Sequence, residues 1–400
     1  MELLTDLEAL LVVVAVAAVA PVVAALLPGR LVPQVVLLII GGIIVGPQAL
    51  DWASADQVAL ISNVGLGFVF LMAGFEIDPR ILVQRPGRLA VTGWVVSLAL
   101  SVLVVGALAA SGFVHAFVPV ALALTTTALG TVLPILKEHR LTGRLFAAQF
   151  LAVGAIGELF PIIAIAVFLG VKSQFSALIS LAAIAVVAAF LSALPRTLEG
   201  RRVAAVVAEG ADTTGQTTLR WSILLLLGLV VLAGKFGLDV VLGAFLAGAV
   251  LRRWAPGDVH SLESKLDAIG YGFFIPVFFV AAGMGVDVDS IITSPARMFV
   301  FLALLLLVRG APTLAIYRST LRLGERVPLM FLTATSLPLI VALTQIGLAS
   351  GTMLPENAAA LVGAGVLSVL LFPIAAVSLA RRVDGSSDLD EPAAPTRQAE

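Results

Sequence analysis

Long apolar runs recur along the whole sequence, and their length constrains the fold more than any other feature does. Most contain roughly 17 to 25 residues, which is the length that an α-helix needs to cross a membrane. In addition, 60% of the residues are hydrophobic and 12% are charged. A water-soluble globule has no interior large enough for that much apolar surface. The sequence therefore predicts an all-α polytopic membrane protein with about thirteen transmembrane helices.

We expect these spans near residues 8–27, 33–47, 57–75, 89–111, 114–136, 145–171, 175–194, 220–234, 237–252, 267–284, 297–317, 327–349 and 358–380. The first run follows an acidic flank where a signal peptide would be basic, so we expect it to be a retained span. Residues 383–400 are polar and acidic without an apolar period. They predict a disordered acidic cytoplasmic tail after a transmembrane domain at residues 1–382.

The charges between the runs predict the orientation, because short cytoplasmic connections carry an excess of Lys and Arg. With the N-terminus outside, the basic residues fall on the inner connections: Arg30; Arg80, Arg85 and Arg88; Lys137, Arg140 and Arg144; Arg196, Arg201 and Arg202; Arg252 and Arg253; Arg318, Arg322 and Arg326; Arg381 and Arg382. The outer connections hold mainly Asp51, Asp56, Asp287, Asp289 and Glu356, with the single bases Lys172 and Lys235. The alternation predicts the N-terminus outside and the C-terminus in the cytoplasm.

Glu158 lies near the centre of the run at 145–171, directly after Gly157. A charged side chain at mid-depth costs at least ~2.5–3.5 kcal/mol, so it is retained mainly where it faces a polar cavity and has a function. One interpretation is a protonated glutamic acid that is hydrogen-bonded to a neighbouring helix. The interpretation that we favour is an acid that binds an ion or a proton.

Two spans are interrupted by hydroxyl side chains, glycine and proline at matching places. The first, near 114–136, contains Thr125, Thr126, Thr127, Gly130 and Pro134; the second, near 327–349, contains Thr333, Thr335, Ser336, Pro338 and Gln345. Paired breaks in two halves of a chain indicate a transport site, because unwound backbone and helix ends can hold ions there. The two spans are seven apart in order and cross the membrane in opposite directions, which predicts an inverted repeat with a linker helix near 175–194.

Arg309 is the second charge that lies deep in an apolar run. An arginine keeps its proton under ordinary conditions and therefore supplies a fixed positive charge. It can neutralise the ends of half-helices or pair with Glu158, and thereby hold the two broken helices together. Direct participation in transport is the alternative. Glu76 and Lys235 lie at predicted span ends, where solvation explains them.

An ordered set of motifs resembles the monovalent cation:proton antiporter 2 family, the bacterial sodium or potassium/proton exchangers. The matching stretches are Gly41–Pro47, Phe70–Asp78, Thr125–Thr127, Leu242–Gly248, Phe274–Met284 and Arg309–Gly310. The resemblance implies a core domain with two crossed broken helices that moves against a dimerisation domain. It also implies a homodimer in the bacterial inner (plasma) membrane and, in place of the family's usual aspartate, Glu158 as the essential acid.

In this family, members with two adjacent carboxylates and a lysine are typically electrogenic. This chain has Gly157 before the acid and Arg309 in place of the lysine, so we expect electroneutral exchange. Proton and cation (Na+, K+ or Li+) would compete for Glu158 during alternating access. Oxygens of Thr125, Thr126 and Thr127 would complete the cation site, supported by Gly157, Arg309, Ser336 and Gln345.

Other classes of protein are less compatible with the sequence. A sodium-coupled organic-anion symporter, with Arg309 anchoring the substrate, is the main alternative. The sequence contains no recognisable catalytic motif of an intramembrane enzyme. A channel is disfavoured because one acid and one base lie at mid-depth, rather than an open polar stripe. We expect no cofactor, no bound metal beyond the transported cation and no nucleic-acid partner, with membrane lipid as the surroundings.

Overall fold

The structure is a computed structural model, and it describes residues 2–26, 32–77, 84–132, 144–169, 174–193, 216–254 and 259–387. The described residues form helices and the connections between them, with no strand among them. In chain order the helices are α1 (Glu2–Leu26), α2 (Gln34–Val45), η2 (Asp56–Val58), α3 (Ala59–Glu76), α5 (Arg85–Ala110), α6 (Phe117–Ala123), α8 (Arg144–Phe168), α9 (Gln174–Ala193), α11 (Thr217–Lys235), α12 (Val240–Trp254), α13 (Val259–Ile269), η4 (Gly270–Phe274), α14 (Ile275–Met284), α15 (Val288–Thr293), α16 (Pro295–Leu304), η5 (Leu305–Gly310), α17 (Pro312–Ile316), η6 (Tyr317–Ser319), α18 (Leu323–Ala334), α19 (Pro338–Ala349) and α20 (Pro355–Ser387).

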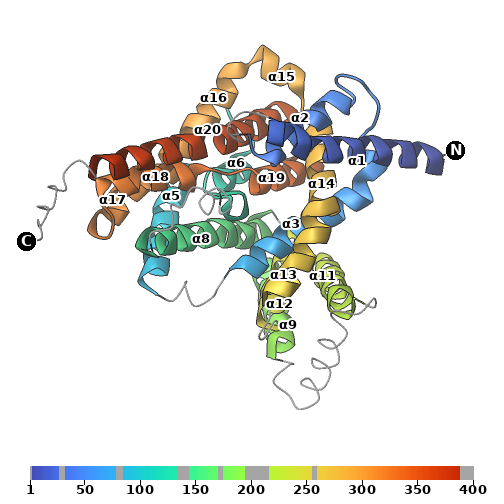
Figure 1. The fold of residues 1–400 in the computed structure, drawn as a ribbon, viewed down its shortest axis with the longest axis horizontal. Helices are drawn as coiled ribbons and strands as arrows, with labels where there is room; N and C mark the ends of the chain where they lie inside the picture. Colours follow the sequence, from blue (N-terminus) through green and yellow to red (C-terminus); the bar gives the residue numbers. More distant parts are fainter. Residues whose placement is uncertain are drawn as a thin grey trace, which may run out of the picture.

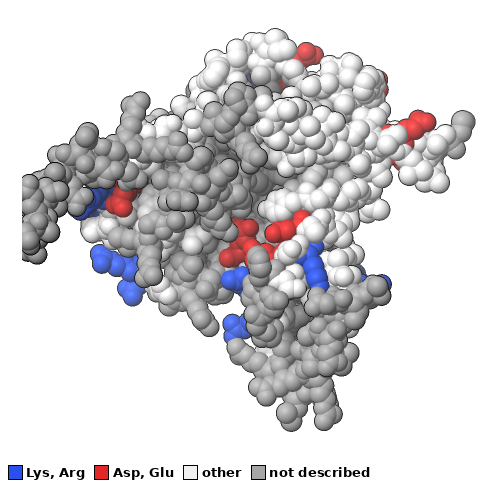
Figure 2. All heavy atoms as spheres, in the orientation of Figure 1, with Lys and Arg blue, Asp and Glu red and all other residues white. Residues whose placement is uncertain are grey.

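Within these ranges, ten helical segments are long and apolar enough to cross a membrane. They coincide with ten of the predicted spans, and the shorter helices α2, α6 and α12 lie at the other three. Figure 2 shows that the described part of one face is mostly uncharged, with acidic side chains gathered near its centre. The all-helical membrane architecture is confirmed. The count of thirteen crossings is not confirmed and stays a prediction.

The helices fall into two groups according to the helices that they contact (Figure 1). The crossing group consists of α5, α6 with the segment 124–132 that follows it, α8 and everything from α15 to α20. The flanking group consists of α1, α2, α3, α9 and the helices from α11 to α14. Close backbone contacts are dense inside each group, whereas the two groups meet mainly where α8 touches α9 and α12 and where α2 touches α20.

Glycines hold the flanking group together, because they let helix backbones touch in an environment without water. A methyl group at Gly74 of α3 would lie 2.0 Å from the Phe245 carbonyl oxygen of α12, and one at Gly248 would lie 2.0 Å from the Leu71 carbonyl oxygen. The crossing of α2 and α14 is built in the same way, since a methyl group at Gly42 would lie 2.0 Å from a carbonyl oxygen of α14. Four of the motifs that carry the family resemblance are thus in contact. The motif containing Gly74 contacts the motif containing Gly248, and the motif containing Gly42 contacts the motif on α14.

The two interrupted spans are broken where the sequence predicts. Helix α6 ends at Ala123 and the next helical turn begins at Leu129, while α18 ends at Ala334 and α19 begins at Pro338. Residues 133–136 of the first predicted span lie outside the described residues. A helix, α9, occupies the predicted linker region. Helix α20 continues into the segment 383–400 as far as Ser387, and the remainder of that segment lies outside the described residues.

Candidate functional site

The two broken segments cross each other and are joined through their unwound backbone. Thr127 donates its hydroxyl hydrogen to the Thr333 carbonyl oxygen at 2.7 Å. The Ala128 N–H donates to the Thr335 carbonyl oxygen at 2.8 Å. Thr333 and Thr335 lie at the end of α18, where helix carbonyls have no partner within the helix. The first broken segment therefore supplies hydrogen-bond donors to carbonyl groups at the end of α18, inside the protein.

Pro161 provides a third anchor for the crossing. A proline in a helix has no N–H to donate to the carbonyl four residues earlier, which in α8 is the Gly157 carbonyl. That oxygen instead accepts a hydrogen bond from the Thr127 N–H at 3.1 Å. The proline three residues after Glu158 thus binds the broken segment to the helix that carries the acid.

The two carboxylate oxygens of Glu158 have different surroundings. The side chain is only 6% exposed. Its Oε1 accepts a hydrogen bond from the Leu129 N–H at 2.8 Å, at the start of the helical turn that follows the first break. Its Oε2 is buried and has no hydrogen-bond partner among the residues that the structure describes. One oxygen therefore holds the crossing, and the other forms no hydrogen bond within the described chain.

Arg309 lies on the π-helical turn η5 and contacts the crossing of the two broken segments. It is only 2% exposed. Its Nε donates to the Thr127 hydroxyl oxygen at 2.9 Å, and its Nη2 donates to the Val153 carbonyl oxygen at 3.1 Å. A methyl group at Gly157 would lie 2.5 Å from the Arg309 Nη2. The guanidinium thus occupies the space that a side chain at position 157 would need. Within the described chain, no ion pair joins Arg309 to Glu158.

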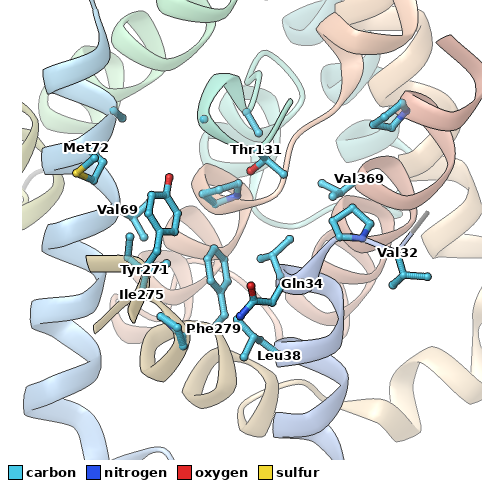
Figure 3. A pocket seen from close by; sticks show the side chains of 18 of the residues that line it. Val32, Gln34, Leu38, Val69, Met72, Thr131, Tyr271, Ile275, Phe279 and Val369 are labelled. Atoms are coloured by element: carbon cyan, nitrogen blue, oxygen red, sulfur yellow. The ribbon is translucent and has the colours of Figure 1, made fainter. Parts of the chain in front are cut away.

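A cavity of about 910 Å³ opens beside Glu158, between the crossing group and the flanking group (Figure 3). Most of its wall is apolar and comes from α1, α2, α3, α14, α19 and α20. Its polar end is formed by Glu158, Thr127 and Thr131 from the crossing group and by Glu76 and Tyr271 from the flanking group, and Gln34 and Ser378 are further polar residues of the wall. The combination of a large apolar chamber and a few converging oxygens is typical of a binding site.

The structure brings some of the predicted site residues together and separates others. Thr127 lines the cavity with Glu158. The Thr125 hydroxyl donates back to the Leu122 carbonyl oxygen at 2.8 Å, and the Thr126 hydroxyl is hydrogen-bonded to that of Ser336. Neither Thr125, Thr126 nor Ser336 is part of the cavity wall.

Gln345 lies apart from Glu158, in a second cavity of about 220 Å³ on the other side of the crossing. This smaller cavity is lined by residues of α14, α19 and α20 such as Ala281 and Val362. Gln345 and Glu158 therefore do not share a cavity in this structure.

Glu76 was not expected at the site, because its position at a span end suggested simple solvation. The structure instead places it on the wall of the large cavity, where it interacts electrostatically with Glu158. The stretch Phe70–Asp78 contained a signal, since it belongs to the motifs that carry the family resemblance.

Comparisons with known proteins agree with this architecture. A family model described as "Sodium/hydrogen exchanger, transmembrane" matches residues 12–381. The protein named "Putative Na(+)/H(+) antiporter YjbQ" of Bacillus subtilis (strain 168) is 28% identical over 373 residues, which cover 88% of this chain and 59% of the relative. The glutathione-regulated potassium-efflux system protein KefC of Enterobacter sp. (strain 638) is 27% identical over 366 residues, which cover 89% of this chain and 58% of the relative.

This chain thus spans 59% and 58% of the lengths of these two relatives. Among solved structures, the sodium proton antiporter MjNhaP1 from Methanocaldococcus jannaschii at pH 8 superposes with a TM-score of 0.65 at 17% identity, over 98% of this chain and 99% of that chain. This similarity extends over the whole fold, including both groups of helices. On the match of the family model to residues 12–381, the chain belongs to the sodium/hydrogen exchanger family.

Proposed function

We propose that the protein exchanges a monovalent cation, Na+ or K+, for protons across a membrane, and that the two compete for Glu158. The observation that carries this proposal is that the two carboxylate oxygens of Glu158 have different surroundings. Its Oε1 is held by the Leu129 N–H, and its Oε2 is buried at the cavity without a partner in the described chain. An ionised Glu158 can offer this oxygen to a cation, and a protonated one releases it.

The cation needs further oxygens once it has lost water. Thr127 and Thr131 line the cavity together with Glu158, and we assign the remaining contacts with the cation to their oxygens. Thr125, Thr126, Gly157, Arg309 and Ser336 then support the crossing that presents these oxygens. Because Arg309 is a fixed charge and Glu158 changes by one charge, one proton exchanges for one cation, and transport is electroneutral.

Alternating access follows from the two groups of helices. We identify the crossing group with the predicted core domain and the flanking group with the dimerisation domain of a homodimer. Movement of the crossing group against the flanking group would expose Glu158 first to the large cavity and then to the small cavity that Gln345 lines. In this proposal the chain lies in the bacterial inner membrane, with its N-terminus outside and its C-terminus in the cytoplasm.

A sodium-coupled organic-anion symporter is less compatible with the site. That function requires Arg309 to reach the substrate, but its guanidinium is 2% exposed and is bonded to Thr127 and Val153. Arg309 is also not part of the wall of either cavity. The geometry therefore favours a structural and electrostatic role for it.

The test is proton movement in proteoliposomes, reported by a pH-sensitive dye, with Na+, K+ and Li+ added in turn. We expect cation-dependent proton movement that does not change when the membrane potential is clamped. A folded protein that moves no protons in response to any of the three cations would refute the proposed exchange.

A further inference from the structure

Tyr271 is a hydroxyl-bearing side chain at the polar end of the large cavity, and the proposed exchange does not yet use it. It lies on the π-helical turn η4, between Gly270 and Gly272. π-Helical turns are rare and are frequent at functional sites, because they redirect the side chains that they carry. The turn is held on α3 by the stacking of Phe274 on Phe68, with ring centroids 4.9 Å apart and planes at 4°.

The Tyr271 hydroxyl and the Glu76 carboxylate border the same small space next to Gly130. A methyl group added at Gly130 would lie 3.7 Å from the Tyr271 hydroxyl oxygen and 3.6 Å from the Glu76 Oε2. Gly130 directly follows Leu129, whose N–H holds Glu158. Tyr271 also interacts electrostatically with Glu158 and Glu76. In Figure 3 the hydroxyls of Tyr271 and Thr131 lie at the same end of the cavity.

These oxygens belong to different groups of helices. Tyr271 and Glu76 come from the flanking group, whereas Glu158 and Gly130 come from the crossing group. A movement of one group against the other therefore changes the distance from Tyr271 to Glu158. Tyr271 can complete the surroundings of a cation at Glu158 only in the arrangement that opens the large cavity.

We propose that Tyr271 is a side-specific cation ligand: its hydroxyl oxygen contacts the cation at Glu158 on the side of the large cavity and not on the opposite side. This inference rests on the proposed exchange function. The charge pattern predicts that this side is the cytoplasm, because α3 ends at Glu76 just before the connection with Arg80, Arg85 and Arg88. The residue would thus set the affinity for cations on one side of the membrane.

The test uses Tyr271→Phe, which removes the hydroxyl and keeps the ring. Exchange is measured in right-side-out and inside-out vesicles, and the half-saturating cation concentration is determined for each side. Loss of one polar contact predicts a rise of about fivefold on the cavity side, while the value on the opposite side changes by less than about twofold. Phe273→Leu alters a ring on the same turn that bears no hydroxyl, and it should leave both values near those of the wild type.

Gly130→Ala provides an independent variant. Its methyl group would make ordinary contacts of 3.6 to 3.8 Å with Glu76 and Tyr271, so the fold should tolerate it. We expect the same one-sided rise, because the methyl group fills the space that the Tyr271 hydroxyl and the Glu76 carboxylate border. An unchanged cavity-side value in Tyr271→Phe, or an equal rise on both sides, would overturn the assignment of Tyr271. Absence of exchange in the wild type would instead overturn the proposed function, and this inference with it.

Discussion

At the scale of single residues, Glu158 combines a structural bond and a proposed transport function in one side chain. Glu158→Gln keeps an oxygen that can accept the Leu129 N–H but cannot become negatively charged. We therefore expect a folded, membrane-inserted protein without cation-dependent proton movement. The measurement is dye-reported exchange in proteoliposomes, together with the thermal stability of the purified protein. Exchange at the wild-type rate would show that another group carries the proton.

Glu158→Asp shortens the same side chain by one methylene and keeps its charge. Both carboxylate oxygens then lie about one C–C bond closer to the backbone of α8, so we expect exchange to continue with an altered cation affinity. The half-saturating concentrations of Na+ and K+ measure this change. Complete loss of exchange, with folding retained, would mean that the reach of the side chain is essential.

Gly157 illustrates how one residue sets the space available to another. In Gly157→Ala, the new methyl group would lie 2.5 Å from the Arg309 Nη2 and 2.7 Å from the Thr127 Cβ. Overpacking of this kind typically costs about 1–3 kcal/mol. We expect a clear fall in thermal stability relative to Gly228→Ala, where a methyl group would have no neighbour within 4 Å. Equal stability of the two variants would contradict the tight packing of Arg309 against position 157.

At the scale of helices, Pro161 connects the acid-bearing helix to the broken segment. In Pro161→Ala, a restored N–H competes with the Thr127 N–H for the Gly157 carbonyl oxygen. We expect slower exchange without loss of helix content, because the crossing loses one of its anchors. Pro328→Ala restores an N–H inside α18, at a residue that lines neither cavity, and should leave the rate unchanged. A similar slowing in both variants would point to a general effect of removing a proline.

The same scale shows what the sequence can predict and what it cannot. Hydrophobic periods and the Thr and Pro breaks locate nearly all helices and both broken segments, because these signals are local. Glu76 and Tyr271 were missed at the site, since the cavity wall combines helices that are distant in sequence. The placement of Gln345 and Glu158 on different cavities could not be predicted for the same reason: both lie on predicted mid-depth segments, but only the packing shows which cavity each one lines.

At the scale of the whole molecule, the two cavities lie at opposite ends of one seam between the groups of helices. In each of α14, α19 and α20, one end lines the large cavity and the other end lines the small cavity. On α19, for example, Leu339 faces the large cavity and Gln345 faces the small one. The seam is thus wide at one end and narrow at the other, as expected for one state of an alternating-access cycle.

The sequence contains no cysteine, so single introduced thiols can report on this seam. Val69→Cys lies on the wall of the large cavity, and Gln345→Cys lies on that of the small one. A membrane-impermeant maleimide should modify them from opposite sides of the membrane. In the proposed alternating-access movement, widening one end of the seam narrows the other, so a cation gradient that speeds modification of one thiol should slow that of the other. Modification of both thiols from the same side, or rates that rise together, would contradict movement of the crossing group against the flanking group.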